Sequence, residues 1–352
     1  MSPVPALLLH HCDTFGGVRS AVLLLLAFSA AVAAQAAKTL EIYFVDVEGG
    51  QATLVVTPDK QSLLVDTGWR GFNGRDADRI VQAAKKAHIK KLDYVLITHY
   101  HRDHVGGAPQ LADRLPVGTW LDHGPNREDT KVVREDFADY ERINKAHHEV
   151  VKPGDHIPLK GVDVTIVSAD GAVIGEPLAG GGQTNPFCAS TPKHEVDNTE
   201  NARSVGFLLS YGRFRFVDLG DLTWNKELEL VCPANKLGTA DVFLISHHGM
   251  NLSNSPALVD ALHPRVAVMD NGARKGGSPE AWDIVKNSPG VEDIWQLHFA
   301  VPGGSAHNSP DPFIANVDEL CQGKALWLSA SEDGSFTVTN TRNNYSKSYP
   351  AR

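Results

Sequence analysis

Three histidines and an aspartate within six positions form the densest group of possible metal ligands in this sequence: His99, His101, Asp103 and His104. His99 and His101 are two residues apart, so on extended chain their side chains point to the same side and can hold one ion. Asp103 and His104 follow where the chain turns, and can reach a second ion nearby. Imidazole nitrogen with carboxylate oxygen suits Zn²⁺ best, and Fe and Mn are the alternatives. A solvated His-rich loop is the competing interpretation, which this spacing behind an apolar strand argues against.

Three further candidate ligands stand at the ends of predicted strands. Asp66 lies in Leu-Val-Asp-Thr-Gly, Asp221 in Asp-Leu-Gly-Asp-Leu, and His247 in Ile-Ser-His-His-Gly. Each has an ordinary explanation by itself, because Asp close to Gly usually forms a turn and His beside Gly is usually a surface residue. A rigid sheet, however, brings strand ends to one rim. We therefore expect these side chains to join the cluster at residues 99–104.

The elements that must position these residues can be predicted from apolar patterns. The continuous apolar run Leu92–Thr98 indicates a buried strand that ends at the histidine cluster. Short apolar runs bounded by Gly, Pro and Asp predict further strands at 40–47, 52–57, 62–66, 117–121, 155–159, 162–168, 204–211, 214–219 and 241–246, and a hairpin over 325–340. Helical spacing predicts helices at 77–87, 108–115, 129–148 and 225–231, and helix–strand units at 255–269 and 279–297.

This order of elements predicts an α/β (α+β) fold. Strands outnumber helices in each half, and the helices are apolar on one side only. The pattern fits two sheets packed face to face with helices outside them, a four-layer αββα sandwich. Residues 171–201 are Gly-rich and polar, and a loop of that length is usually functional or disordered. No linker-like stretch divides the chain, so we expect one domain over residues 37–345.

The N-terminus has the pattern of a secretory signal. An apolar run over residues 21–34 follows Arg19, and Ala34-Gln-Ala36 offers a small-x-small cleavage site. The run is short for a membrane span, which makes a permanent anchor the less favoured alternative. We expect residues 1–36 to be a signal peptide and the protein to be periplasmic or secreted.

Composition limits the partners and the thiol chemistry. The net charge of −9 argues against unspecific attraction to phosphate backbones, so no stable nucleic-acid partner is expected. Removal of the signal with Cys12 leaves Cys188, Cys232 and Cys321, which can form at most one disulfide. Without a Cys-x-x-Cys pair, thiolate metal chemistry is not expected.

The quoted motifs resemble those of the metallo-β-lactamase superfamily. The run His-x-His-x-Asp-His at 99–104 matches its signature, and Asp221 and His247 match its later acidic and His motifs, over about residues 40–300. Within the superfamily the chain is most similar to the ComEC/Rec2-like branch. The pieces that carry this similarity are Phe-Val-Asp-Val-Glu-Gly-Gly-Gln at 44–51, Val-Asp-Thr-Gly at 65–68, Phe-Val-Asp-Leu-Gly-Asp at 216–221 and Ser-His-His-Gly at 246–249.

The resemblance implies a dinuclear zinc-type metallo-hydrolase with a hydroxide held between two ions. It also implies a distribution of ligands: His99 and His101 on the first metal, Asp103, His104 and His247 on the second, and Asp221 bridging both. Asp66 would accept an imidazole N–H and fix the orientation of one ligand.

Two departures from the superfamily pattern stand out. A third His for the first metal is usual, but the aligned stretch 200–204 contains none. His194, six residues earlier, could substitute if its loop folds back, and His123 is a weaker candidate. Structural or surface roles are the default for both. The branch also often has a His before a late Pro, where this chain has Ser278.

The chemistry of such a site predicts hydrolysis. Zn²⁺ lowers the pKa of a bound water from near 16 to about 7, so hydroxide is present at neutral pH. Asp103 could orient this nucleophile, and His248 could protonate the leaving group or serve only as a structural hydrogen-bond donor. We expect a small-molecule ester substrate, with phosphodiesters and phosphoesters preferred because two ions suit the charge of phosphoryl transfer. A lactone or β-lactam-type acyl hydrolase is one alternative, and a metal-dependent binding protein with little turnover is the other.

Overall fold

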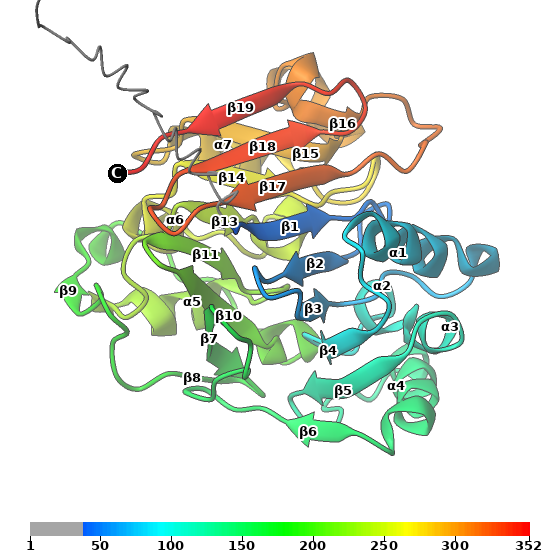
Figure 1. Cartoon of the computed structure of the whole chain (residues 1–352). Coiled ribbons are helices and arrows are strands. Elements are labelled where there is room, and N and C mark those ends of the chain that lie inside the picture. The colour runs from blue at the N-terminus through cyan, green and yellow to red at the C-terminus, as the bar shows by residue number, and fades with distance from the viewer. Residues whose placement is uncertain (1–37) are drawn as a thin grey trace, which may run out of the picture. The chain divides into compact units, whose positions relative to one another are not determined.

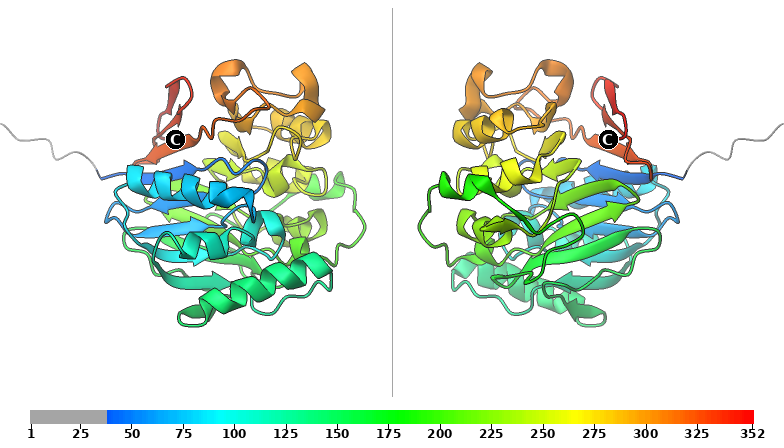
Figure 2. Two further views of the ribbon diagram at one scale, coloured as in Figure 1. Left: turned by 90° about the vertical axis from the view of Figure 1, so that its right-hand side faces the viewer. Right: turned by 90° about the vertical axis from the view of Figure 1, so that its left-hand side faces the viewer.

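Two β-sheets lie face to face, and helices cover the outer face of each (Figure 1). The computed structural model describes residues 38–352, and the expected signal segment lies outside them. Buried apolar side chains form three clusters: one between the sheets, and one under the helices on each side. The predicted four-layer αββα sandwich is therefore confirmed, and Figure 2 shows the layers from both sides.

The first sheet has nine strands in the order β19-β18-β17-β1-β2-β3-β4-β5-β6. Strands β3 to β6 run parallel to one another, and the remaining pairs are antiparallel. The strands are β1 Leu40–Phe44, β2 Thr53–Val56, β3 Ser62–Val65, β4 Leu92–Leu96, β5 Val117–Asp122, β6 His148–Val150, β17 Leu326–Ala330, β18 Phe336–Asn340 and β19 Ser346–Tyr349.

The second sheet has eight strands in the order β16-β15-β14-β13-β11-β10-β7-β8. Strands β11, β13, β14, β15 and β16 are parallel neighbours. The strands are β7 Asp163–Ala169, β8 Ala172–Val173, β10 Gly206–Tyr211, β11 Phe214–Asp218, β13 Val242–Leu244, β14 Val266–Met269, β15 Asp293–His298 and β16 Ile314–Asn316. A small separate ladder joins β9 Gln183–Thr184 to β12 Ala234–Asn235.

The helices divide between the two outer faces. Helices α1 (Arg75–Lys86), α3 (Ala108–Ala112) and α4 (Lys131–Asn144) share a buried cluster with the first sheet. Helices α5 (Trp224–Val231), α6 (Pro256–Leu262) and α7 (Pro279–Asn287) do the same for the second. The short α2 (Arg102–Val105) lies inside the histidine signature. Short 3-10 turns occur at Phe72–Gly74, Pro186–Ala189, Glu200–Arg203, Ser246–Gly249, Val301–Ala306 and Asp311–Phe313.

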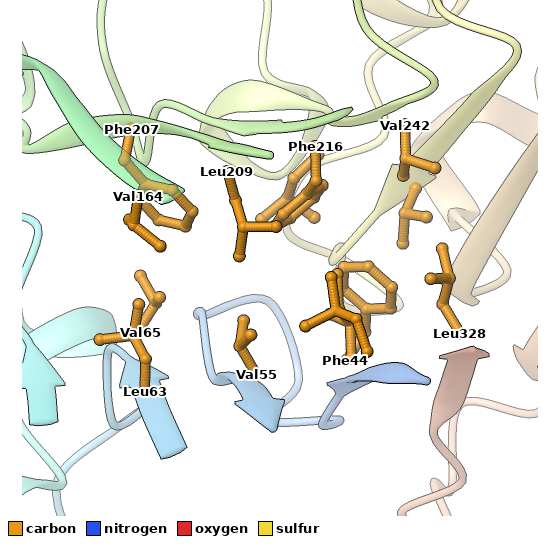
Figure 3. Close-up of a cluster of buried hydrophobic side chains, with 14 of the residues drawn as sticks. Phe44, Val55, Leu63, Val65, Val164, Phe207, Leu209, Phe216, Val242 and Leu328 are labelled. Atoms are coloured by element: carbon orange, nitrogen blue, oxygen red, sulfur yellow. The ribbon is translucent and has the colours of Figure 1, made fainter. Parts of the chain in front are cut away.

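Alternating side chains of each strand separate the layers. In β1, Leu40, Ile42 and Phe44 face the second sheet, whereas Tyr43 packs with the helices. Figure 3 shows the inter-sheet contact, in which Phe44 and Phe216 approach from opposite sheets. Their rings are 6.0 Å apart between centroids, edge to face. This apolar interface holds the two sheets against each other. It thereby also fixes the relative positions of the strand ends along the edge of the sandwich.

The cysteines form one disulfide, within the limit expected from their number. Cys188 and Cys232 are bonded, which ties the long segment before β10 to the end of α5. Within residues 38–352 Cys321 is the cysteine that remains free. Its Sγ lies 2.6 Å from a carboxylate oxygen of Asp46, which is fully buried.

Several boundaries differ from the sequence prediction. The strand predicted at 155–159 is wrong, because this segment makes only one isolated bridge, between His156 and Thr165. The 171–201 segment is ordered by β8, β9, two 3-10 turns and the disulfide. Strand β19 lies beyond residue 345, where we expected the domain to end, and pairs with β18. Among the described residues, no helix has the length and apolar character that a membrane span needs.

The inter-sheet core gives a stability prediction. Phe216 is fully buried and touches aromatic rings from both sheets, Phe44 and Phe207. We expect Phe216→Ala to lower the free energy of unfolding by about 3–5 kcal/mol, because it removes apolar area and leaves a cavity. Denaturant unfolding measures this. Leu320→Ala, at a side chain that is 90% exposed, serves as the control and should change it by less than about 0.5 kcal/mol. Equal effects of the two changes would contradict this packing.

Candidate metal centre

The candidate ligands lie at one rim, where neighbouring parallel strands end. In the first sheet, Asp66 directly follows β3 and the 99–104 signature follows β4. In the second sheet, Asp221 follows β11 and the His247–His248 pair follows β13. Because the sheets pack face to face, these loops meet at the same edge. The convergence expected from the sequence is thus present.

The most compact group consists of Asp103, His104, Asp221 and His248. All four are buried, and their ligand atoms lie within 4.8 Å of one another. The Nε2 of His104 is 3.3 Å from Oδ2 of Asp103 and 3.3 Å from Oδ2 of Asp221. The Nε2 of His248 is 3.2 Å from Asp103 Oδ2 and 3.5 Å from Asp221 Oδ1. Two imidazoles and two carboxylates therefore face one point.

The other three predicted ligands, His99, His101 and His247, lie next to this group. His99 Nε2 is 3.8 Å from Asp221 Oδ2 and 3.1 Å from Nδ1 of His101. His247 Nε2 is 3.4 Å from the same Asp221 oxygen. Asp221 is thus in contact with both groups, which is the position of a bridging ligand.

Three outer carboxylates each hold one ring nitrogen of His101, His104 or His248. Asp66 lies 2.7 Å from His104 Nδ1, as expected from the sequence. Glu128 lies 2.9 Å from His101 Nε2, and Asp270 lies 3.1 Å from His248 Nδ1. Such a carboxylate fixes the orientation and tautomer of an imidazole ligand. Glu128 and Asp270 were missed in the sequence, where no spacing or motif marks either of them.

The His247–His248 pair differs from the expected assignment. The resemblance implied His247 as the ligand beside Asp103 and His104, but the structure places His248 there, with Asp270 behind it. Both residues adopt left-handed backbone, at φ 56° and 54°. This conformation is uncommon outside Gly and is often found at functional sites. The two neighbouring rings contact different carboxylate oxygens of Asp221, His247 approaching Oδ2 and His248 approaching Oδ1.

Charge within the cluster keeps the carboxylates ionised. Burial alone would raise the pKa of Asp103 and Asp221, but the surrounding imidazoles, His104 foremost, hold both pKa values well below the usual range. Burial alone would lower the pKa of His248, but Asp221 and other carboxylates raise it to about 9. Metal ligands must be deprotonated, and the two carboxylates already are at neutral pH.

The residues present fit a metal ion. Asp221 Oδ1 is buried and accepts no hydrogen bond within the described part of the chain. A buried carboxylate oxygen without a donor is costly, and a cation would satisfy it. Imidazole nitrogen and carboxylate oxygen together suit Zn²⁺, and also Fe and Mn.

The stretch 200–204, where a third His is usual, begins with Glu200 in this chain. Its carboxylate is fully buried and accepts bonds from His123 Nε2 at 2.9 Å and from the Arg127 backbone N–H at 2.7 Å. His123 therefore has a structural partner. The His194 ring stacks on Trp224, with centroids 3.9 Å apart, and none of its contacts reaches the cluster. Neither histidine replaces the missing ligand.

Two contacts from elsewhere in the fold position the loops of the cluster. Gln51 Nε2 donates to Asp218 Oδ2 at 2.6 Å. This bond connects the motif at residues 44–51 to the segment before Asp221. Glu227 on α5 accepts the backbone N–H groups of Asn254 and Ser255, both at 2.7 Å. The loop after His248 is thereby attached to α5.

A family model described as "Metallo-beta-lactamase superfamily" matches residues 45–186, which include the signature, Asp66 and Glu128. Over these residues the chain matches the metallo-beta-lactamase superfamily. Recombination protein 2 of Haemophilus influenzae is 25% identical over 71% of this chain and 26% of its own length. ComE operon protein 3 of Bacillus subtilis is 24% identical over 66% of this chain and 28% of its own length. The chain thus spans about a quarter of these relatives.

Other proteins are similar over smaller parts or at lower identity. Hydroxyacylglutathione hydrolase of Xylella fastidiosa is 28% identical over 33% of this chain and 36% of its own length. Among solved structures, the metallo-beta-lactamase fold protein YhfI of Bacillus subtilis aligns with a TM-score of 0.45 and 13% identity, over 74% of this chain and 96% of its own.

The contact between Asp270 and His248 leads to a test of the ligand set. We expect Asp270→Asn to weaken zinc binding about 10–100-fold, because the ring would lose the carboxylate that orients it. Zinc affinity is measured by competition with a chromophoric chelator. Asp260→Asn, at a half-buried carboxylate on α6, is the matched control and should leave the affinity unchanged. An unaltered zinc affinity in Asp270→Asn would show that His248 is not a metal ligand.

Proposed function

We propose that this protein is a metal-dependent hydrolase that acts on an ester, with phosphodiesters and phosphoesters preferred. The observation that supports this most directly is the buried cluster of Asp103, His104, Asp221 and His248, with outer carboxylates behind its imidazoles. A rigid, buried set of nitrogen and oxygen ligands at a strand-end rim is suited to catalysis, since its side chains do not have to reorganise during the reaction.

The proposed centre holds two Zn²⁺ ions, with Fe or Mn as alternatives. Asp103, His104 and His248 would hold one ion, His99 and His101 the other, and Asp221 both. Bound metal supplies an activated water and stabilises negative charge on the reacting group. Among the chain's own groups, Asp103 also accepts a hydrogen bond from Lys275, so it can orient a nucleophile. His247 lies 3.4 Å from Asp221 Oδ2 and is the imidazole of the group without a ligand role in this assignment, so it is the one available to contact the substrate.

Lys275 favours an anionic substrate. Its Nζ contacts the Asp103 carboxylate and lies 4.9 Å from the centre of the Trp69 ring. The backbone N–H of Gly277 donates to His248 O at 2.9 Å, and a Cβ at Gly276 would come within 2.1 Å of the same oxygen. The loop of Lys275, Gly276 and Gly277 is therefore packed directly against His248 of the metal-ligand cluster. A cation at this point would attract a phosphodiester and contribute little to a neutral ester.

Two alternatives are supported by specific observations. The partial similarity to hydroxyacylglutathione hydrolase supports an acyl substrate, such as a thioester, lactone or β-lactam. The absence of a histidine from residues 200–204 supports a binding protein with little turnover, because the first site has fewer ligands. The substrate panel described below separates all three.

We propose in addition that the protein is exported to the periplasm or secreted. The sequence pattern of residues 1–36 supports this, and so does the Cys188–Cys232 disulfide, since disulfides persist mainly in oxidising compartments. The proposed binding partner of the protein is a small-molecule ester. We propose neither a stable nucleic-acid complex nor a permanent membrane anchor.

Metal removal and one substitution test the proposal. The zinc-loaded protein should hydrolyse bis-(p-nitrophenyl) phosphate, and chelation should abolish the activity reversibly. Asp221→Ala should lower kcat/KM at least about 10³-fold, because it removes the group shared by both sites. Asp163→Ala, at an exposed carboxylate on β7, is the control and should retain full activity.

Other outcomes of the same panel would decide against a phosphoesterase. Hydrolysis of nitrocefin or an acyl lactone alone would favour the acyl alternative. About one bound zinc per chain with no turnover of any substrate would favour the binding protein.

The Lys275 contact predicts a charge preference. Lys275→Met should raise KM for bis-(p-nitrophenyl) phosphate about tenfold and leave p-nitrophenyl acetate hydrolysis within about twofold, because only the anion loses an ion-pairing partner. Lys275→Arg should restore most of the affinity for the phosphodiester. Steady-state kinetics with both substrates measures this, and an equal loss on the two substrates would show that the lysine is not a substrate contact.

A further inference from the structure

The Trp69 side chain belongs to the loop that follows β3 and Asp66 in the first sheet. Hydrogen bonds attach this loop to the histidine signature. The backbone N–H and the Oγ1 of Thr67 both donate to His104 O, at 2.8 and 2.7 Å. The backbone N–H of Trp69 itself donates to Asp76 Oδ2 on α1 at 2.8 Å. Position 69 is therefore fixed relative to the metal ligand His104.

The Lys275 side chain comes from the other sheet, in the loop after β14. Its backbone is fixed in the same way. Gly272 N–H donates to Lys275 O at 2.9 Å, and Gly277 N–H donates to His248 O at 2.9 Å. These bonds do not fix Nζ, because a flexible four-carbon stem separates it from the backbone. The position of the ammonium group thus depends on the contacts that Nζ makes itself.

Among the described residues, Lys275 Nζ contacts the Asp103 carboxylate and the face of the Trp69 ring. It forms an ion pair with Asp103 Oδ2 and lies 4.9 Å from the ring centroid. An ammonium group within about 6 Å of the centroid of a Trp ring is attracted by the negative face of the ring. Trp69 and Lys275 therefore connect loops of the two sheets beside the metal centre.

The two contacts of the ammonium group differ in how a bound metal would affect them. Asp103 is a proposed metal ligand, and its Oδ2 also lies 3.3 Å from His104 Nε2 and 3.2 Å from His248 Nε2. A carboxylate that is shared with a metal cation attracts an ammonium group less strongly. The indole ring has no charge to share, so its attraction for Lys275 does not depend on the metal. Trp69 can therefore hold the ammonium group when Asp103 binds an ion.

We propose that Trp69 is a positioning residue for Lys275: its ring holds the ammonium group beside the metal centre, where it pairs with the anionic ester of the substrate. The inference rests on the proposed function, which assigns Lys275 to the substrate anion. It adds a residue that sets the preference for an anion without touching the substrate. A charge that is already in place binds its partner at a lower ordering cost.

Phosphonates, which contain no ester to hydrolyse, test this role independently of turnover. Methylphosphonate and phenylphosphonate are titrated into the zinc-loaded protein by isothermal calorimetry. Trp69→Leu should weaken both ligands equally, about three- to fivefold, because the attraction between ring and ammonium is lost. Trp69→Phe keeps an aromatic face and should restore most of the affinity. The zinc content of both Trp69 variants should equal that of the parent protein.

Trp327→Leu on β17 is the matched control. The Trp327 ring also faces a lysine, with Lys86 Nζ of α1 at 5.1 Å from its centroid. This substitution removes a comparable contact from another pair of elements, so it should leave the affinity for both phosphonates unchanged.

A double-mutant cycle shows whether Trp69 acts through Lys275. In the Lys275→Met background, Trp69→Leu should weaken phosphonate binding by less than about 1.5-fold, since the ammonium group that the ring holds is already absent. Kinetics provide a second readout. Trp69→Leu should raise KM for bis-(p-nitrophenyl) phosphate about three- to fivefold, and should change kcat and p-nitrophenyl acetate hydrolysis by less than about 1.5-fold.

The outcomes separate this role from the proposed reaction. Weaker binding of phenylphosphonate alone would make the ring a direct substrate contact and would overturn the positioning role. An equal effect of Trp69→Leu with and without Lys275, or no effect in either background, overturns it as well, as does a parent protein that binds neither phosphonate. A Lys275-dependent loss of phosphonate binding in a protein that hydrolyses no phosphodiester supports the role of Trp69 and counts against the proposed function alone.

Discussion

The structure depends on one electrostatic constraint: Asp103, Asp221 and several imidazoles are removed from water at one rim, so each must have a partner. An unpaired buried charge is far more destabilising than a paired one, and the geometry of the cluster leaves little choice of partners. Strands from both sheets must end at the same level to bring these groups together. The apolar contact between the sheets, with Phe44 against Phe216, holds that alignment. Core packing and the site are therefore parts of the same arrangement.

Much of this arrangement could be predicted because its signals are local. The 99–104 signature is contiguous, and the apolar run before it indicates a buried strand without any knowledge of the rest of the fold. The four layers followed from the alternation of one-sided helices with short strands. The strand prediction at 155–159 was wrong because the segment alternates between polar and apolar residues like a strand. In the structure only His156 makes a bridge, to Thr165.

The parts that could not be predicted depend on tertiary contacts. Glu128 and Asp270 occupy loops in which an acidic residue has no particular spacing, and only the fold brings them to His101 and His248. The choice between His247 and His248 depends on backbone torsions that the motif does not reveal. Likewise, the sequence offers His194 as a substitute for the absent ligand, whereas in the structure its ring stacks on Trp224.

The environment of Cys321 has a consequence for how the chain matures. Burial, together with the neighbouring Asp46 carboxylate, raises the pKa of this thiol to about 12, so almost none of it is thiolate at physiological pH. Thiol–disulfide exchange proceeds through the thiolate. Once the chain has folded, the Cys321 thiol is therefore a poor attacker of the Cys188–Cys232 bond, so that bond persists beside the third cysteine of residues 38–352.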